Sequence, residues 1–113
     1  MRRDPKVLLW DAKDAADAIA DMTSGKTFEQ LVGDIVLRSA VERQFEIVGE
    51  ALARLARVDE RTAQLIPNLP RIVAFRNILI HGYAEIDHTR VWVVIEKHLP
   101  RLRETLSELL SRD

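Results

Sequence analysis

The apolar residues of this 113-residue chain recur with the period of an α-helix in three long stretches. Within each stretch they follow one another at spacings of three and four residues, which places them on one face of a helix. Each stripe predicts an amphipathic helix whose apolar face joins a shared core. The three stripes are Leu8, Ala12, Ala15, Ile19 and Met22; Leu37, Val41, Phe45, Val48, Leu52 and Leu55; and Val91, Ile95, Leu99, Leu102, Leu106 and Leu109.

Capping signals indicate where the first two helices begin. Asp4 precedes a proline, which is typical of a helix start because the Asp side chain caps free amides and proline fits the first turn. The first helix is expected to run to about Met22, where a turn cluster follows. Thr27, with Gln30 three residues later, has the pattern of a capping box that restarts the helix.

Prolines and a glycine divide the second half of the chain. The long second helix should end near Arg57, and a short helical piece should follow it before the next proline-containing connection. A third main helix is predicted from about Pro70 to Gly82. Glycine at this end favours a C-cap in the left-handed conformation. The last helix should kink at Pro100. Four main helices with short connections predict a single all-α domain over residues 1–113, an up-and-down antiparallel four-helix bundle with an extra short helix.

Composition narrows the class of protein. Hydrophobic residues make up 47% and charged residues 31%, with only 4 Gly and 4 Pro, which is the balance of a folded, helix-rich globule. The absence of cysteine excludes disulfide scaffolds, zinc fingers and thiol nucleophiles. No apolar run approaches the ~20 residues of a membrane span, and no signal-peptide core follows the N-terminus. We therefore expect a cytoplasmic protein with no role at a membrane.

Charge argues against general binding of nucleic acids. The net charge of −1 lacks the basic excess of proteins that hold nucleic acid mainly through phosphates. Between positions 54 and 76, however, the chain has five arginines and only two acidic residues, Asp59 and Glu60. This segment is either a local positive patch beside a site or a set of solvated helix faces. The five are Arg54, Arg57, Arg61, Arg71 and Arg76.

The candidate site lies in the third predicted helix. From position 72 to 80 every residue is apolar except Arg76 and Asn77, and His81 and Tyr83 follow directly. A helix that is apolar nearly all round must be covered by neighbours or by a second subunit, and a charge buried there requires a partner. One interpretation is an Arg paired with Glu46 or Glu50 beside a core histidine. The other is a site for phosphate chemistry.

The second interpretation requires Arg76 and His81 to meet. Five residues on a helix rotate by about 140° beyond a full turn, so the two side chains do not point the same way. Either the Arg side chain swings toward the helix end, or two copies of the motif share one cleft across a twofold axis. Apolar residues off the stripes, such as Trp10 and Trp92, fit either a dimer or an ordinary core edge.

If both groups reach one RNA phosphate, they suffice for cleavage without a metal or cofactor. The Arg76 guanidinium can hold the non-bridging oxygens, and His81 can serve as general base on the 2′-hydroxyl or as acid on the leaving oxygen. DNA lacks the attacking hydroxyl and should not be cut. Asn77 is expected either to bind the phosphate or to act as a structural hydrogen-bonding group.

Metal catalysis and nucleotide hydrolysis have little support. The three histidines are not spaced as ligands on one helix face, and no HExxH motif or glycine-rich phosphate loop is present. His88 is expected near the start of the last helix and His98 on its surface or edge, and neither is expected to be catalytic.

The chain resembles the HepT-like family of HEPN-domain toxins over nearly its whole length. The matching segments, in order, are Ala40-Val41-Glu42-Arg43, Ile47-Val48-Gly49-Glu50-Ala51, the proline-containing connection, Arg76-Asn77-x-x-x-His81-x-Tyr83, Val91-Trp92 and Leu99-Pro100. One position departs from the pattern, since Arg71 follows Pro70 where family members often carry an aromatic residue.

The resemblance implies a homodimeric, metal-independent endoribonuclease, the toxin of a type VII-like toxin–antitoxin pair. It implies that Arg76 and His81 form the catalytic pair in a cleft at the dimer interface, and that the partner is a nucleotidyltransferase antitoxin. It also implies that the antitoxin silences the nuclease by adenylylating Tyr83, a residue that could otherwise simply pack its ring over the helix end. The alternative function is a non-catalytic helical module that binds the nucleotidyltransferase or a nucleotide.

Overall fold

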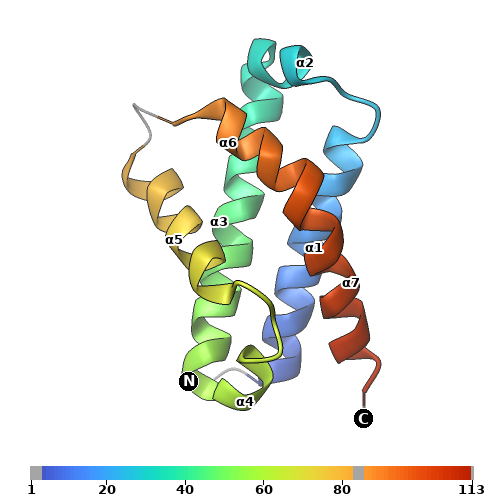
Figure 1. Ribbon diagram of the computed structural model, residues 1–113, viewed down its shortest axis with the longest axis vertical. Helices are drawn as coiled ribbons and strands as arrows, with labels where there is room; N and C mark the ends of the chain where they lie inside the picture. Colours follow the sequence, from blue (N-terminus) through green and yellow to red (C-terminus); the bar gives the residue numbers. More distant parts are fainter. Residues whose placement is uncertain (1–3, 83–85, 113) are drawn as a thin grey trace.

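Helices account for the regular structure of the chain in the computed structural model (Figure 1), which describes residues 4–82 and 86–112. No strand occurs in these two ranges, so the predicted all-α class is confirmed. None of the described helices is long and apolar enough to cross a membrane. The elements are α1 (Pro5–Thr23), α2 (Phe28–Gly33), α3 (Ile35–Val58), α4 (Glu60–Ala63), α5 (Leu69–His81), α6 (His88–Val93), the π-helical segment η2 (Val94–His98) and α7 (Leu99–Leu110).

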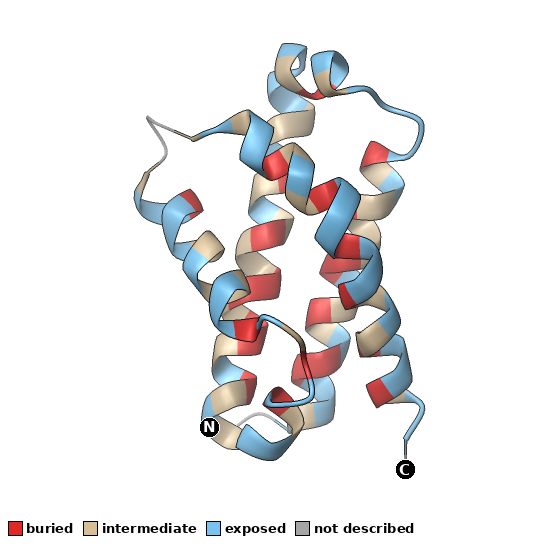
Figure 2. Cartoon of the chain, viewed as in Figure 1, coloured by how far each residue is buried: buried red, intermediate tan, exposed pale blue. Residues whose placement is uncertain are grey.

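The helices pack as a bundle in which α1 and α3 form the centre. Helix α1 packs against α3 and α7, whereas α5 packs mainly against α3. Figure 2 shows the buried positions gathered where α1, α3 and α7 face one another, while α5 on the outside is mostly exposed or half-buried. Within α5, only Leu69 and Leu79 are buried. The apolar helix that carries the motif is therefore covered on one side only.

The predicted apolar stripes form the core. The stripe of the last helix is buried throughout, and those of α1 and α3 are buried except at their outermost residues, Met22 and Leu37. Apolar residues off the stripes mostly pack at the core edge. The ring of Phe75 meets that of Phe45 edge-on at 5.3 Å, and Trp92 meets Phe28 at 6.2 Å. Trp10 is different, because it stays exposed.

The predicted helix starts are confirmed by hydrogen bonds. Asp4 Oδ1 accepts from the Lys6 amide at 2.8 Å. Thr27 and Gln30 form a complete capping box, with bonds of 2.9 and 3.1 Å. The structure adds a break that the apolar pattern does not show. The Asp34 side chain accepts from two amides at the start of α3, so α2 is a separate short helix rather than the first turns of the long one.

Two features in the second half of the chain, the cap at Gly82 and the irregularity near Pro100, differ in detail from the prediction. Gly82 caps α5 as expected, but its φ is −107°, so the predicted left-handed cap is wrong. Its small size matters instead, because a Cβ there would lie 2.9 Å from the Ile78 carbonyl oxygen. The irregularity expected at Pro100 takes the form of the π-helical segment just before α7, where a proline removes an amide donor from the helical ladder.

Candidate active site

Arg76 projects from α5 toward α3, where Glu50 is its partner. The Arg76 Nη2 donates to Glu50 Oε2, and its Nη1 donates to Asn77 Oδ1 at 2.8 Å. The Arg76 Nε is buried with no hydrogen-bond partner, while 25% of the side chain remains exposed. Glu50 was one of the two carboxylates expected to compensate this charge. The guanidinium is thus fixed on two sides and still accessible to a ligand.

Gly49 allows α5 to approach α3 closely at this point. A Cβ added to Gly49 would lie well under 3.0 Å from both Cβ and Cγ of Arg76. The glycine therefore lets the first atoms of the Arg76 side chain rest directly on the α3 backbone. The sequence did carry a signal for this contact, since a glycine inside a long helix costs about 1 kcal/mol relative to alanine and tends to have a packing reason. Sequence reasoning did not use it.

A groove of about 340 Å³ opens beside Arg76, between α1, α3 and α5. Its lining combines side chains of opposite charge with apolar side chains. The charged lining residues are Asp11, Arg43, Glu46, Glu50, Arg54 and Arg76, and the apolar ones are Leu8, Ile47, Ala51 and Ile80. The formal charges of the lining cancel, so an anion can bind here only by hydrogen-bonding to particular cations rather than by a general positive field.

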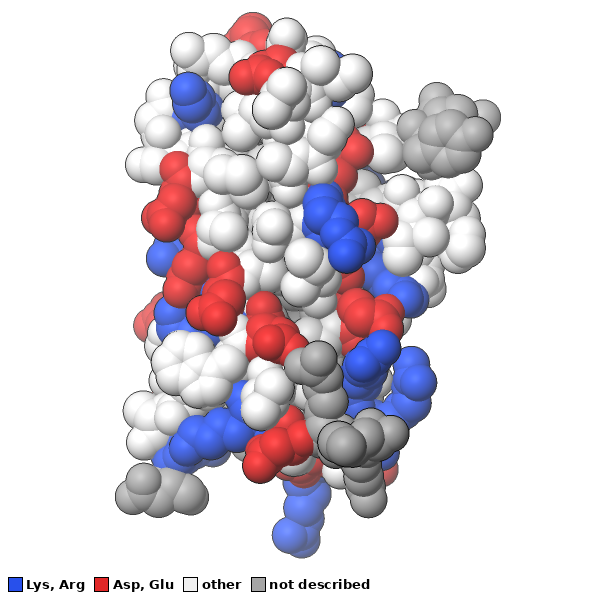
Figure 3. Space-filling view, turned by 180° about the vertical axis from the view of Figure 1, so that it is seen from behind, with Lys and Arg blue, Asp and Glu red and all other residues white. Residues whose placement is uncertain are grey.

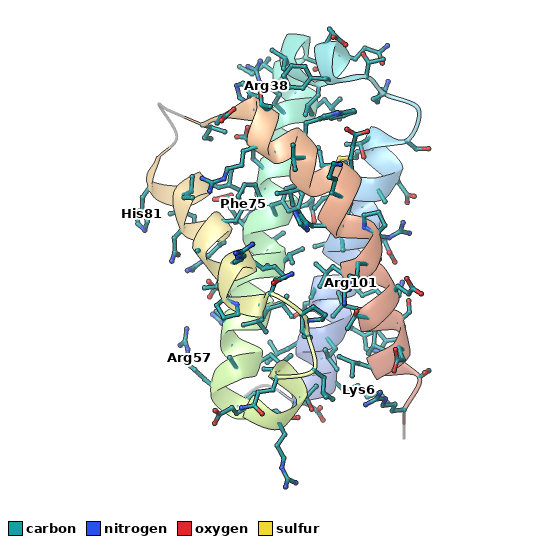
Figure 4. The ribbon with its side chains drawn as sticks, in the orientation of Figure 1. Lys6, Arg38, Arg57, Phe75, His81 and Arg101 are labelled. Carbon is teal, nitrogen blue, oxygen red and sulfur yellow. The ribbon has the colours of Figure 1, made fainter. Side chains whose placement is uncertain are left out.

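Of the basic segment predicted from the sequence, Arg54 and Arg76 line this groove. Arg57, Arg61 and Arg71 are exposed, and Figure 4 shows Arg57 pointing away from the bundle. On the face drawn in Figure 3, acidic and basic side chains alternate and form no continuous basic surface. The segment therefore contributes individual arginines to the site.

His81 is the last residue of α5 and is exposed. Figure 4 shows it at the outer end of the helix, directed away from the bundle. It does not line the groove, and within the described residues no hydrogen bond joins it to Arg76. One copy of the chain thus keeps the two groups apart, as their spacing predicted.

Asn77 and Tyr83 complete the motif. Asn77 is exposed, and its side-chain oxygen accepts the hydrogen bond from Arg76. That bond orients the guanidinium through the Asn77 oxygen, so the amide nitrogen of this exposed side chain is not used in it. Tyr83 lies outside the described residues.

The other histidines occupy the positions predicted for them. His88 opens α6, and its Nδ1 lies 4.0 Å from Glu42 Oε2 on α3. Burial raises the pKa of Glu42, although the charges of His88 and Arg38 act in the opposite direction. His98 is exposed. Within residues 4–82 and 86–112, no three His, Asp or Glu side chains are grouped as metal ligands.

Comparison with known proteins places these features in a family. Residues 12–109 match the family model described as Ribonuclease HepT-like. A protein of Methanocaldococcus jannaschii, whose name describes it as a candidate RNase, is 32% identical over 91% of this chain and 94% of its own length. The probable ribonuclease HepT of Thermococcus cleftensis is 30% identical over 96% of this chain and 98% of its own. No solved structure gives a significant match. With a family model that spans nearly the whole bundle and relatives aligned along almost their full lengths, this chain belongs to the HepT-like ribonuclease family.

Proposed function

We propose that the protein is a metal-independent endoribonuclease that cleaves RNA with Arg76 and His81. Family membership supports ribonuclease activity, and two of the similar proteins carry ribonuclease names. The observation that carries the proposal is the fixed yet accessible guanidinium of Arg76 in a groove, five residues before an exposed histidine on the same helix. Such a pair supplies charge stabilisation and proton transfer, the two functions that cleavage of an RNA phosphodiester requires.

In the proposed reaction the 2′-oxygen of the ribose attacks the adjacent phosphorus. The 2′-hydroxyl gives its proton to a base, the bond from phosphorus to the 5′-oxygen breaks, and the leaving oxygen takes a proton from an acid. The products are a 2′,3′-cyclic phosphate and a free 5′-hydroxyl. Arg76 holds the non-bridging oxygens while negative charge develops on them, and His81 transfers a proton. DNA, which lacks the 2′-hydroxyl, is not a substrate.

The active form is proposed to be a homodimer. Helix α5 packs mainly against α3, and its exposed apolar residues include Ile78 at 38% and Ile80 at 37%. Both lie in the last turns before His81, so a second copy that covers them would sit beside the motif. A twofold axis here would let the histidine of one copy approach the groove of the other. The dimer would thereby join two groups that a single copy holds apart.

The biological role is proposed to be that of a toxin in a type VII-like toxin–antitoxin pair. Its partner would be a nucleotidyltransferase that silences the nuclease by attaching AMP to Tyr83. Tyr83 is two residues from His81 in sequence, so the added phosphate would bring bulk and negative charge close to the proposed acid–base group. Co-expression with a candidate nucleotidyltransferase should add the mass of one AMP to the wild-type chain and none to Tyr83→Phe.

The test of the nuclease is cleavage of total RNA and tRNA by the purified, unmodified protein in the presence of EDTA. Arg76→Ala and His81→Ala should each abolish cleavage, and His98→Ala, which removes an exposed histidine elsewhere, should not. Products should carry the cyclic phosphate. Cleavage that survives both motif substitutions would contradict the proposal.

The second candidate function is a binding module for the nucleotidyltransferase or a nucleotide. The observation in its favour is that Glu50 already compensates the charge of Arg76, so the ion pair has a structural explanation. This function predicts a stable complex with the partner that does not depend on His81. It also predicts that an unmodified protein cleaves no RNA.

A further inference from the structure

Glu50 binds two arginines at once. Its Oε2 accepts from Arg76 on α5, and its Oε1 accepts from Arg54 Nε at 3.1 Å, one turn further along α3. Both guanidiniums line the groove. One carboxylate therefore draws together two cations that come from different helices.

Arg54 is the more accessible of the two cations. Its side chain is 50% exposed, against 25% for Arg76. A guanidinium has five N–H donors, and the bond to Glu50 uses one of those on Arg54, so donors remain for a ligand. Long arginine side chains lose conformational entropy when they become ordered, and a side chain already held by Glu50 has lost part of it before a ligand arrives.

The remaining lining of the groove suits a chain of phosphates rather than an isolated anion. Ile47 and Ala51 add apolar side chains to the lining, and its formal charges cancel. A single free phosphate would meet the nearby carboxylates with little net attraction. A nucleic acid strand can bind two cations through successive phosphates while its sugars and bases contact apolar side chains of the lining.

We propose that Arg54 is a second phosphate-binding residue, which holds an RNA phosphate next to the one bound by Arg76, and that Glu50 positions both guanidiniums. The proposal rests on the proposed ribonuclease function and deepens it, because it defines the path of the RNA strand along the groove between α1, α3 and α5. Arg54 anchors the substrate, and Arg76 acts at the scissile bond.

The test measures binding separately from cleavage. The probe is a single-stranded RNA oligonucleotide in which every 2′-hydroxyl is methylated, so that the proposed reaction cannot occur. Its affinity is measured over a range of salt concentrations for the wild type and for Arg54→Gln, Arg54→Lys and Arg101→Gln. Arg101, labelled in Figure 4, is an exposed arginine on α7 that does not line the groove, and its variant controls for the loss of one positive charge.

Each phosphate contact with a single strand steepens the plot of log affinity against log salt by about 0.7. Arg54→Gln should therefore bind about tenfold more weakly at low salt, with a slope shallower by about 0.7. Arg54→Lys should keep most of the slope because it keeps the charge, and Arg101→Gln should match the wild type. Thermal melting followed by circular dichroism checks that each variant is folded.

Three results would overturn the proposal: an unchanged slope in Arg54→Gln, an equal loss in Arg101→Gln, or no binding of the probe by the folded wild-type protein. Displacement of the probe by an equal concentration of AMP would also overturn it, since the groove would then be a nucleotide site. None of these results decides whether the protein cleaves RNA, because the EDTA assay with the Arg76 and His81 variants decides that independently.

Discussion

Gly49 on α3 and Arg76 on α5 meet in a contact so close that the glycine has no room for a side chain. The contact fixes the first side-chain atoms of Arg76 against α3. It thereby limits which residues the guanidinium can reach. Glu50, the next residue of α3, is its ion-pair partner. The geometry of the candidate site therefore depends on a backbone contact between two helices.

Gly49→Ala is predicted to damage both stability and the site. Overpacking at a close contact typically costs about 1–3 kcal/mol, which exceeds the gain of about 1 kcal/mol that alanine brings to a helix interior. Urea denaturation should show a net loss of stability, and RNA cleavage should fall further than the loss of folded protein explains. Gly33→Ala is the matched control, since a Cβ at Gly33 would meet nothing within 4 Å. Equal stability of the two variants would contradict the prediction.

The features of the fold that could be predicted from sequence are those that depend on local interactions. Helix faces and caps depend on local periodicity and on single side chains, so the buried stripes and the Thr27–Gln30 capping box were predictable. The break at Asp34 was not, because apolar residues continue on both sides of it, and the extended backbone of this one residue, with its capping bonds, separates α2 from α3.

In the candidate site too, some residues could be predicted from sequence and some contacts could not. The motif pointed to Arg76 and His81, and the cost of burying a charge pointed to a carboxylate on the preceding long helix. The choice between Glu46 and Glu50, and the link from Glu50 to Arg54, required the relative rotation of two helices. That rotation is determined by side-chain packing between α3 and α5, which single-sequence periodicity does not specify.

Arg76→Lys is predicted to separate charge from geometry in the proposed reaction. Lysine keeps the positive charge but lacks the planar fork that can donate to Glu50, Asn77 and a phosphate together. Loss of one well-placed donor to a developing oxyanion typically lowers kcat by about 10²–10³. Steady-state cleavage of a defined RNA should therefore show a large fall in kcat with a small change in KM. Activity within a few-fold of the wild type would mean that positive charge alone suffices.

Glu50→Gln is predicted to lower kcat without raising KM. The substitution weakens the bond that orients Arg76, and it also removes a negative charge from the groove that would repel phosphate. We expect kcat to fall about tenfold with little change in KM, because the loss of a repelling charge offsets the weaker hold on Arg54, and general unfolding would not produce this split. Glu46→Gln removes a charge from the same groove without touching Arg76 and should leave kcat unchanged. A parallel fall of kcat in both variants would contradict a specific positioning role for Glu50.

Asp17 should make the bundle sensitive to acid. Burial alone would raise the pKa of Asp17, but hydrogen bonds from Lys13 at 2.6 Å and Arg103 at 2.8 Å outweigh it and lower the pKa. A carboxylate with a lowered folded-state pKa stabilises the protein above its unfolded pKa, and this stability is lost as the pH falls through the folded value. Asp17→Asn should cost about 1 kcal/mol at pH 7, and this cost should shrink as the pH falls below the ordinary pKa of an aspartate and through the lowered folded pKa. The control is Asp14→Asn, an exposed carboxylate on the same helix, and a pH-independent difference between wild type and Asp17→Asn would contradict the argument.

Subunit mixing should reveal whether the active site is shared between two copies. If Arg76 of one copy acts with His81 of the other, a dimer of one Arg76→Ala chain and one His81→Ala chain keeps one intact pair. Random reassortment makes half of the dimers mixed, so two inactive proteins, unfolded and refolded together, should recover roughly a quarter of wild-type activity. Mixing either variant with the Arg76→Ala/His81→Ala double variant should recover none. If both groups instead act within one copy, every chain in the mixture is defective, and the absence of recovery would show that the Arg76 side chain reaches the histidine at the end of its own helix.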